Sequence, residues 1–237
     1  NDPGSNGTIY VDDADATLID CVLEDNSAEG GYSGIRVVGS QSRLTVTGGR
    51  FERNVNTGNP MLGGAISSEG GSLEVSGVTF RDNETEADGA AIFISSDSRI
   101  SDVVIDGCLF AGNTSVGTSD VHSLTPDGLI FTNNVVIASS FSPQAVLIHN
   151  SSEDAEYTVA NNTFIRTSTT SPCAINAYPD GAIRVFNNVF NGFGTRIISN
   201  GWYWTDLSID RSDIRQNLIR DYLPQAGDGI DPSNFGG

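Results

Sequence analysis

The chain has no lysine, and its 237 residues include only two histidines, three cysteines and one methionine. All twelve basic residues are therefore arginine, and thirty acidic residues leave a formal net charge of −18. Nucleic acid and anionic membrane are excluded as direct partners, because both would be repelled and no basic stripe is visible. The carboxylates suit a hydrated surface in salty surroundings, and they also allow binding of multivalent cations.

Long apolar runs are also missing, so we expect no direct membrane insertion. The chain begins at Asn1 rather than at methionine, as a processed secreted protein or an excised ectodomain would. We therefore expect a secreted or cell-surface location.

The chain is instead rich in one repeat. Each repeat carries an apolar anchor, preceded seven and five residues earlier by an apolar pair that alternates with polar residues, as one face of a strand does. The anchors recur every 24 to 30 residues, at Leu23, Phe51, Phe80, Phe110, Val136, Phe164, Phe190 and Ile214. A period of this size over most of the chain predicts a solenoid.

A bend must separate the pair from the anchor, since the anchor would otherwise point outward. In six repeats the residue three before the anchor is of a type that tolerates positive φ: Gly48, Gly77, Gly107, Asn133, Asn161 or Asn187. The residue after the bend is asparagine in three consecutive repeats, Asn134, Asn162 and Asn188, which predicts a ladder of stacked amides.

Each repeat is too short for a strand plus a full helix, and no segment shows a sustained helical period. We predict an all-β fold, a single-domain right-handed parallel β-helix of about eight coils over residues 1–237. The repeats occupy residues 16–217, with residues 1–15 as an N-terminal lead-in or cap and residues 218–237 as a C-terminal cap or tail. Caps are expected because an open coil exposes unpaired strand edges.

The cysteines follow the repeat rather than a metal motif. Cys21 and Cys108 hold the same repeat position three coils apart, which at about 4.8 Å per coil is too far for a disulfide. With Cys173 they show no C-x-x-C spacing, so we expect small packing residues.

Two short motifs support a resemblance. A Phe-x-x-Asn motif occurs at Phe51–Asn54, Phe80–Asn83 and Phe110–Asn113, and a Gly-Gly-Ala-Ile motif at Gly63–Ile66. Over about residues 51–113 the chain resembles the polymorphic outer membrane protein family and related bacterial surface β-helix proteins. The resemblance implies a cell-surface or secreted passenger with an adhesive role. The phenylalanines and asparagines themselves are expected in the core and in turns or ladders.

An acidic loop follows the anchor Phe80. Its carboxylates are Asp82, Glu84, Glu86 and Asp88, and several oxygen ligands in a short loop suit Ca²⁺. The spacing is not that of a known calcium loop, so a solvated acidic loop is the alternative. Calcium is the only cofactor that we consider.

Both tryptophans lie in one triplet, Trp202, Tyr203 and Trp204. In an extended segment Trp202 and Trp204 share a face, and a pair of exposed indoles can stack on sugar rings. The alternative is that the triplet closes the last coils against solvent.

An enzyme is the main competing class, because β-helices also carry polysaccharide lyases and glycoside hydrolases. Such enzymes need a base or a pair of carboxylates. The adjacent carboxylates Glu24 and Asp25 have none of the companion motifs of polygalacturonases. His122 and His149 fall in adjacent repeats and would lie near each other, which is the best catalytic signal in the chain. We assign no catalytic residue.

We therefore expect a non-catalytic extracellular binding or structural module, adhesin-like and suited to glycan binding. Its partner would be a polysaccharide, or a glycan or protein on a host or neighbouring cell. The alternatives are a carbohydrate-active enzyme and a filament subunit that associates end to end through heterologous contacts.

Overall fold

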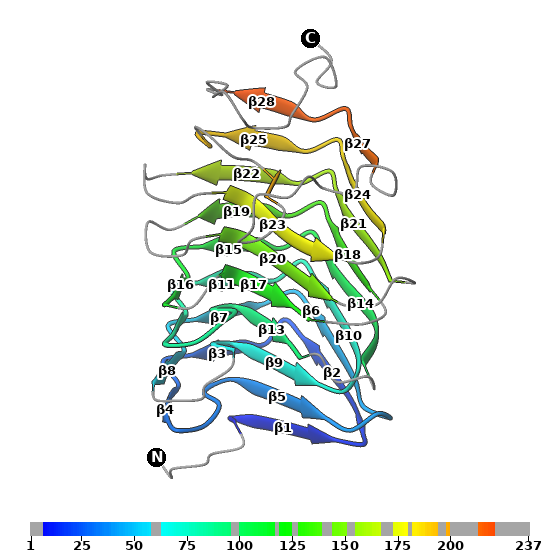
Figure 1. Ribbon diagram of the computed structural model, residues 1–237. Helices are drawn as coiled ribbons and strands as arrows, with labels where there is room; N and C mark the ends of the chain where they lie inside the picture. The colour runs from blue at the N-terminus through cyan, green and yellow to red at the C-terminus, as the bar shows by residue number, and fades with distance from the viewer. Residues whose placement is uncertain are drawn as a thin grey trace.

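The computed structural model describes residues 7–57, 63–95, 100–116, 119–124, 128–138, 144–150, 155–166, 173–179, 182–193, 198–199 and 213–220. All regular elements in these ranges are strands, which stack coil upon coil into a rod (Figure 1). The strands form three sheets of eight strands and one sheet of four. No helix in the described ranges could cross a lipid bilayer.

The first two strands of each coil belong to sheets 1 and 2. Sheet 1 consists in order of β1 (Ile9–Asp12), β5 (Ile35–Val38), β9 (Ile66–Glu69), β13 (Ile92–Ile94), β17 (Ser119–Ser123), β20 (Gln144–Asn150), β23 (Cys173–Pro179) and β26 (Ile198–Ser199). Sheet 2 consists of β2 (Asp15–Ile19), β6 (Arg43–Thr47), β10 (Gly71–Ser76), β14 (Ile100–Asp106), β18 (Gly128–Thr132), β21 (Glu156–Ala160), β24 (Ala182–Phe186) and β27 (Asp213–Arg215).

The anchors lie in sheet 3, and sheet 4 follows it in the N-terminal coils. Sheet 3 consists of β3 (Val22–Glu24), β7 (Arg50–Glu52), β11 (Thr79–Arg81), β15 (Leu109–Ala111), β19 (Val135–Ala138), β22 (Thr163–Arg166), β25 (Val189–Asn191) and β28 (Leu218–Arg220). Sheet 4 consists of β4 (Ser27–Glu29), β8 (Val55–Thr57), β12 (Glu84–Thr85) and β16 (Thr114–Ser115).

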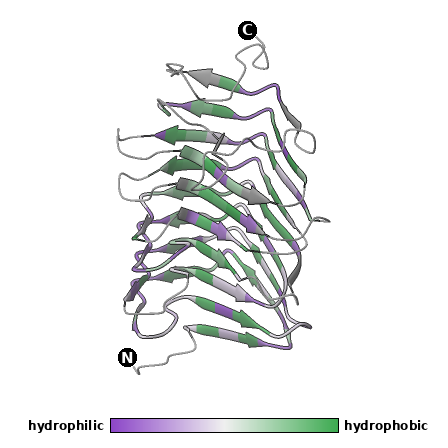
Figure 2. Ribbon diagram, viewed as in Figure 1, coloured by the Kyte–Doolittle hydropathy of each residue, from purple (hydrophilic) through white to green (hydrophobic). Residues whose placement is uncertain are grey.

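Neighbouring strands are parallel, and equivalent positions of successive repeats pair with each other. Leu44 of β6 pairs with Leu73 of β10, and Phe51 of β7 pairs with Phe80 of β11. Figure 2 shows apolar and polar residues mixed along the strands of all sheets. The predicted all-β parallel β-helix is therefore confirmed.

One predicted anchor is wrong. Ile214 pairs with Val185 in sheet 2, and the residue opposite the anchor Phe190 in sheet 3 is Ile219. The bend lies between them at Gln216, which has φ of 55°. The sequence pattern missed it because glutamine is not a usual residue at positive φ.

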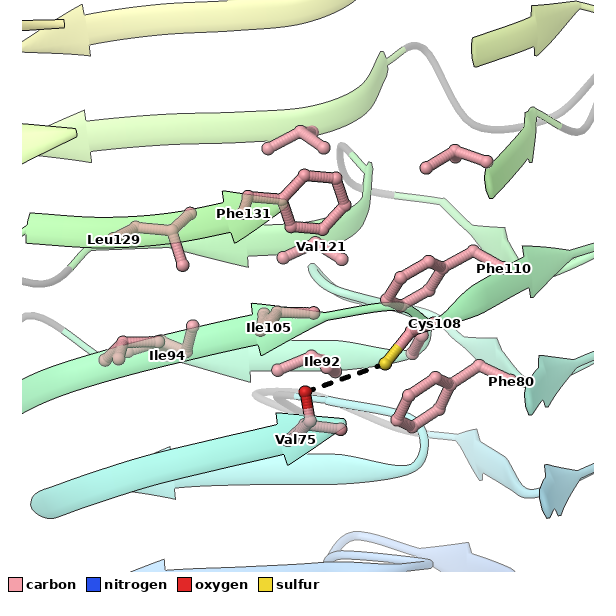
Figure 3. Packing of buried hydrophobic residues seen from close by; sticks show 14 of the residues in the cluster. Val75, Phe80, Ile92, Ile94, Ile105, Cys108, Phe110, Val121, Leu129 and Phe131 are labelled. Carbon is pink, nitrogen blue, oxygen red and sulfur yellow. Dashed lines mark hydrogen bonds between the residues drawn. The ribbon is translucent and has the colours of Figure 1, made fainter. Parts of the chain in front are cut away.

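A stack of aromatic rings runs through the core. The centroids of Phe80 and Phe110 are 5.1 Å apart, as are those of Phe164 and Phe190. Between these pairs the anchor is Val136, and the ring of Phe131 from sheet 2 fills the space (Figure 3). Its centroid lies 5.8 Å from that of Phe110 and 6.4 Å from that of Phe164. The aromatic stack is thus continuous because one of its rings comes from sheet 2 instead of sheet 3.

The predicted amide ladder forms at the bend between sheets 2 and 3. Asn134 donates its backbone N–H to Oδ1 of Asn162 over 2.8 Å, and Nδ2 of Asn162 donates to Oδ1 of Asn188 over 3.0 Å. Asn217 extends the ladder, since its Oδ1 accepts from Nδ2 of Asn188 over 3.0 Å. The bend residues Asn133, Asn161 and Asn187 all have positive φ, as predicted.

A second ladder uses the asparagines of the Phe-x-x-Asn motif. Nδ2 of Asn54 donates to Oδ1 of Asn83, and Nδ2 of Asn83 donates to Oδ1 of Asn113, each over 2.9 Å. Nδ2 of Asn83 also donates to the carbonyl of Phe51 over 2.8 Å. All three amides are fully buried, so their role is structural as expected.

We expect Asn83→Ala to destabilise the fold, because it removes the acceptor of Asn54 and the donor to Phe51. Each buried group left unpaired costs about 1–3 kcal/mol in the free energy of unfolding. Chemical denaturation followed by circular dichroism measures the loss. Asn26→Ala, at the half-buried end of the ladder, is the control and should cost less. Equal losses would show that the ladder carries no special stability.

The aromatic stack makes a second prediction. Phe131→Val should open a cavity, and Val136→Phe alone should overpack the same space at a cost of about 1–3 kcal/mol. The double variant exchanges the two side chains and should recover stability, with a coupling free energy of about 0.5–3 kcal/mol. A thermodynamic cycle on the four proteins tests this. Strictly additive losses would contradict the proposed compensation.

Candidate functional site

The outer face of sheet 1 carries one row of register-matched side chains. From the N-terminal coil onward the row is Tyr10, Arg36, Ser67, Phe93, His122, Leu147 and Asn176. Tyr10 is 44% exposed and Arg36 is half-buried, whereas Ser67 and the four residues after it are buried. The N-terminal end of this row is therefore open to a ligand.

Two tyrosines surround an arginine at this open end, and we call Tyr10, Tyr32, Arg36 and Glu69 the tyrosine–arginine patch. The guanidinium carbon of Arg36 lies 4.3 Å from the ring centroid of Tyr32 and 5.8 Å from that of Tyr10. Arg36 also binds Glu69 through two bonds, Nε to Oε1 at 2.9 Å and Nη2 to Oε2 at 3.2 Å. The patch thus joins three successive coils and presents aromatic and polar groups together.

The hydroxyl groups of the patch remain donors over the physiological pH range. Burial, together with the hydrogen bond and the negative charge of Glu69, raises the pKa of Tyr32 to about 12. The hydroxyl of Tyr10 donates to Oδ2 of Asp12 over 3.2 Å. Sequence reasoning missed the patch because Tyr10 lies 13 residues before its anchor and Arg36 lies 15 residues before its own. Spacing from the anchors therefore does not align the two.

Farther along the same row, His122 is paired with a carboxylate. Its Nδ1 lies 3.3 Å from Oδ2 of Asp88, and its ring meets that of Phe93 edge to face at a centroid distance of 5.4 Å. The imidazole is only 7% exposed. A histidine held by a carboxylate can act as a general base in an enzyme. The burial of His122 is, however, typical of a structural contact.

The two histidines lie on adjacent strands but are not opposite each other. His122 pairs with Leu147, and His149 lies two residues farther along β20, opposite Tyr178. His149 is exposed, unlike His122. The sequence therefore placed them near each other correctly but not in register.

The four carboxylates proposed for calcium do not converge on one point. Glu84 and Glu86 are exposed on either side of the buried Thr85, Asp82 lies at a bend with φ of 51°, and Asp88 faces His122. Within the described ranges no three His, Cys, Asp or Glu residues form a group suited to a metal ion. Calcium binding by these residues stays a prediction.

The adjacent carboxylates Glu24 and Asp25 lie in an ion-pair network. Arg53 binds Asp25 through Nε at 2.7 Å and Nη2 at 2.8 Å, and Arg50 Nη2 lies 3.3 Å from Glu24. The hydrogen bond from Arg53 lowers the pKa of Asp25. A carboxyl held ionised in this way is poorly suited to act as a general acid.

Trp202, Tyr203 and Trp204 lie outside the described residues, so their role in glycan binding stays a prediction.

The three cysteines differ in exposure. Cys21 is half-buried, whereas Cys108 and Cys173 are 2% exposed. Cys108 lies between core side chains, with its Sγ 3.7 Å from the carbonyl oxygen of Val75 (Figure 3). Burial raises the pKa of Cys108 to about 11.

We expect a thiol reagent at pH 8 to modify Cys21 rapidly and Cys108 hardly at all. Since the pKa of Cys108 is raised, its thiolate forms only as the pH approaches about 11. Ellman's reagent measures the rate, and Cys21→Ser should remove the fast phase. Reaction of Cys108 in the folded protein, at the rate seen in denaturant, would contradict the buried position.

The comparisons with known proteins agree with this architecture. The family described as right-handed beta helix region matches residues 3–164, which is more than half of the chain. Comparison with curated proteins and with solved structures found no match. The match also agrees with the predicted handedness of the solenoid. The chain belongs to the right-handed β-helix family.

Proposed function

We propose that the chain is a non-catalytic binding module of a secreted or cell-surface protein, and that it recognises glycans. The tyrosine–arginine patch carries this proposal. Sugar-binding surfaces combine aromatic rings, which pack against the apolar faces of sugars, with fixed hydrogen-bonding groups. Tyr10 supplies an exposed ring, and Arg36 is held in place by Tyr32 and Glu69.

The rod shape and the family support the same proposal. The outer face of sheet 1 is accessible at its N-terminal end, and a right-handed β-helix is compatible with both surface binding and carbohydrate-active roles. Membership of the polymorphic outer membrane protein family, an adhesive role and a protein partner belong to the same proposal. They rest on the Phe-x-x-Asn and Gly-Gly-Ala-Ile motifs alone.

We expect Tyr10→Ala to weaken glycan binding by about fivefold, equivalent to roughly 1 kcal/mol for one lost stacking contact. A panel of neutral and acidic polysaccharides, with and without calcium, is followed by affinity electrophoresis and calorimetry. Tyr10→Phe should keep most of the affinity because it keeps the ring.

The control for this experiment is Ile19→Ala, which changes a side chain 66% exposed on the neighbouring sheet 2. It should leave binding unchanged. Equal effects of Tyr10→Ala and Ile19→Ala, or no binding to any polysaccharide, would refute the proposal.

A carbohydrate-active enzyme is the second candidate, and the contact between Asp88 and His122 favours it. Such a pair can take a proton from a sugar when the imidazole is accessible. New chain ends in the same panel, lost in His122→Gln and reduced in Asp88→Asn, would establish this alternative. Binding without new chain ends would reject it.

A further inference from the structure

The outer face of sheet 3 changes character halfway along the rod. In β3, β7 and β11 it carries charged residues, among them Glu24, Arg50 and Arg81. From β15 to β25 the outward positions are uncharged, and together with Leu218 of β28 we call them the apolar strip: Leu109, Ala111, Val135, Ile137, Thr163, Ile165, Val189, Asn191 and Leu218. The strip ends at Arg220 of β28, which lies opposite Asn191. Each residue of the strip is half-buried or exposed. Such a strip stands out on a chain of charge −18.

A row of exposed amides borders the strip. The bend before each strand holds Asn133, Asn161, Asn187 or Gln216, all exposed and all at φ between 55° and 58°. In the preceding coils the same bend holds Asp20, Gly48, Gly77 and Gly107, which have no amide. Nδ2 of Asn133 donates to Asp106 over 2.6 Å. We therefore place ligand contacts at the other three amides.

The amide row begins one coil after the strip, because Gly107 holds the bend before β15, and both rows share the period of the strands. Successive strands lie about 4.8 Å apart, so the five strands of the strip span roughly 20 Å, with a width of about 10 Å. The resulting area, on the order of 200 Å², is far below the roughly 800 Å² that each partner of a stable dimer buries. The strip is thus too small to hold a second copy, but it matches one extended polymer chain.

We infer that the apolar strip and the amide row bind one extended chain of an uncharged polysaccharide that lies along the rod. The inference rests on the proposed glycan-binding function and names the chemical class of the ligand. The strand spacing is close to the length of one sugar ring, so successive sugars meet equivalent groups. The apolar faces of the sugars pack against side chains such as Val135 and Val189, and hydroxyl groups bond to Asn161 and Asn187.

The charge of the chain decides between polysaccharide classes. A polymer of uronic acids would be repelled by a protein of net charge −18. None of the nine strip residues is basic, and the arginines of these strands, Arg166 and Arg220, lie at the ends of β22 and β28. An uncharged polymer is not repelled by the protein, and its hydroxyl groups can bond to the amides as both donors and acceptors.

The test uses the full chain and insoluble cellulose, insoluble chitin and soluble β-glucan as probes, with polygalacturonate as the charged comparison. Asn161→Gly with Asn187→Gly removes two amides, and glycine already occupies this bend at Gly48 and Gly77. Val135→Asp with Val189→Asp places charge on the strip. The matched control is Ile130→Asp, which alters a residue 46% exposed on sheet 2. Thermal melting checks folding of each variant.

We expect the chain to bind at least one uncharged polysaccharide more tightly than polygalacturonate. Each double variant should bind at least tenfold more weakly, with Ile130→Asp unchanged and melting temperatures preserved. Wild-type affinity in both folded double variants would overturn this inference and leave the proposed function standing. Preference for polygalacturonate would overturn the ligand class, and no binding to any probe would overturn both proposals. A dimer in sedimentation equilibrium that Val135→Asp with Val189→Asp dissociates would assign the strip to a second copy instead.

Discussion

The parallel register between successive coils is the constraint on which the structure depends. Once equivalent positions of adjacent repeats pair, every side chain stacks on its own counterpart at about 4.8 Å. The phenylalanine rings and the asparagine amides become continuous columns for this reason, as do the groups of the outer faces. A shift by one residue would move each apolar side chain outward and break both ladders. The sheets, the core and the surfaces therefore share one cause.

The columns of asparagine amides satisfy backbone groups that would otherwise be unpaired at the bends. At each bend the backbone leaves carbonyl and N–H groups that no strand pairs, and burial of such groups is costly. Buried amides such as Asn83 and Asn188 bond to a carbonyl of one coil and to the amide of the next. One ladder serves the coils that have sheet 4, and the other serves the coils after it. Asparagine is thus used where the path of the chain changes.

Much of this architecture follows from the sequence, because the repeat joins a strand period to a bend that requires glycine or asparagine. The anchor of the last repeat was assigned wrongly because Gln216 occupies the bend, so the anchor is Ile219 rather than Ile214. The replacement of a phenylalanine anchor by Phe131 could not be predicted from the spacing, because Phe131 lies in sheet 2 and the anchors lie in sheet 3. The contact of Asp88 with His122 joins a loop and a strand of different coils. Spacing along the chain does not predict this contact, although Asp88 was proposed as a calcium ligand and His122 as a catalytic candidate.

The same register makes the outer faces of the rod periodic. A repeated surface gains little from any single contact, but it multiplies each one along a ligand of matching period. Charge divides the outer face of sheet 3, since the ion pairs of Arg50 and Arg53 lie in the N-terminal coils and the apolar strip follows them. For the proposed polymer ligand, a shift toward the N-terminal end would replace apolar contacts with charged side chains such as Glu24 and Arg50. In the proposed complex, the boundary at β15 therefore sets the N-terminal limit of a binding surface that spans five strands.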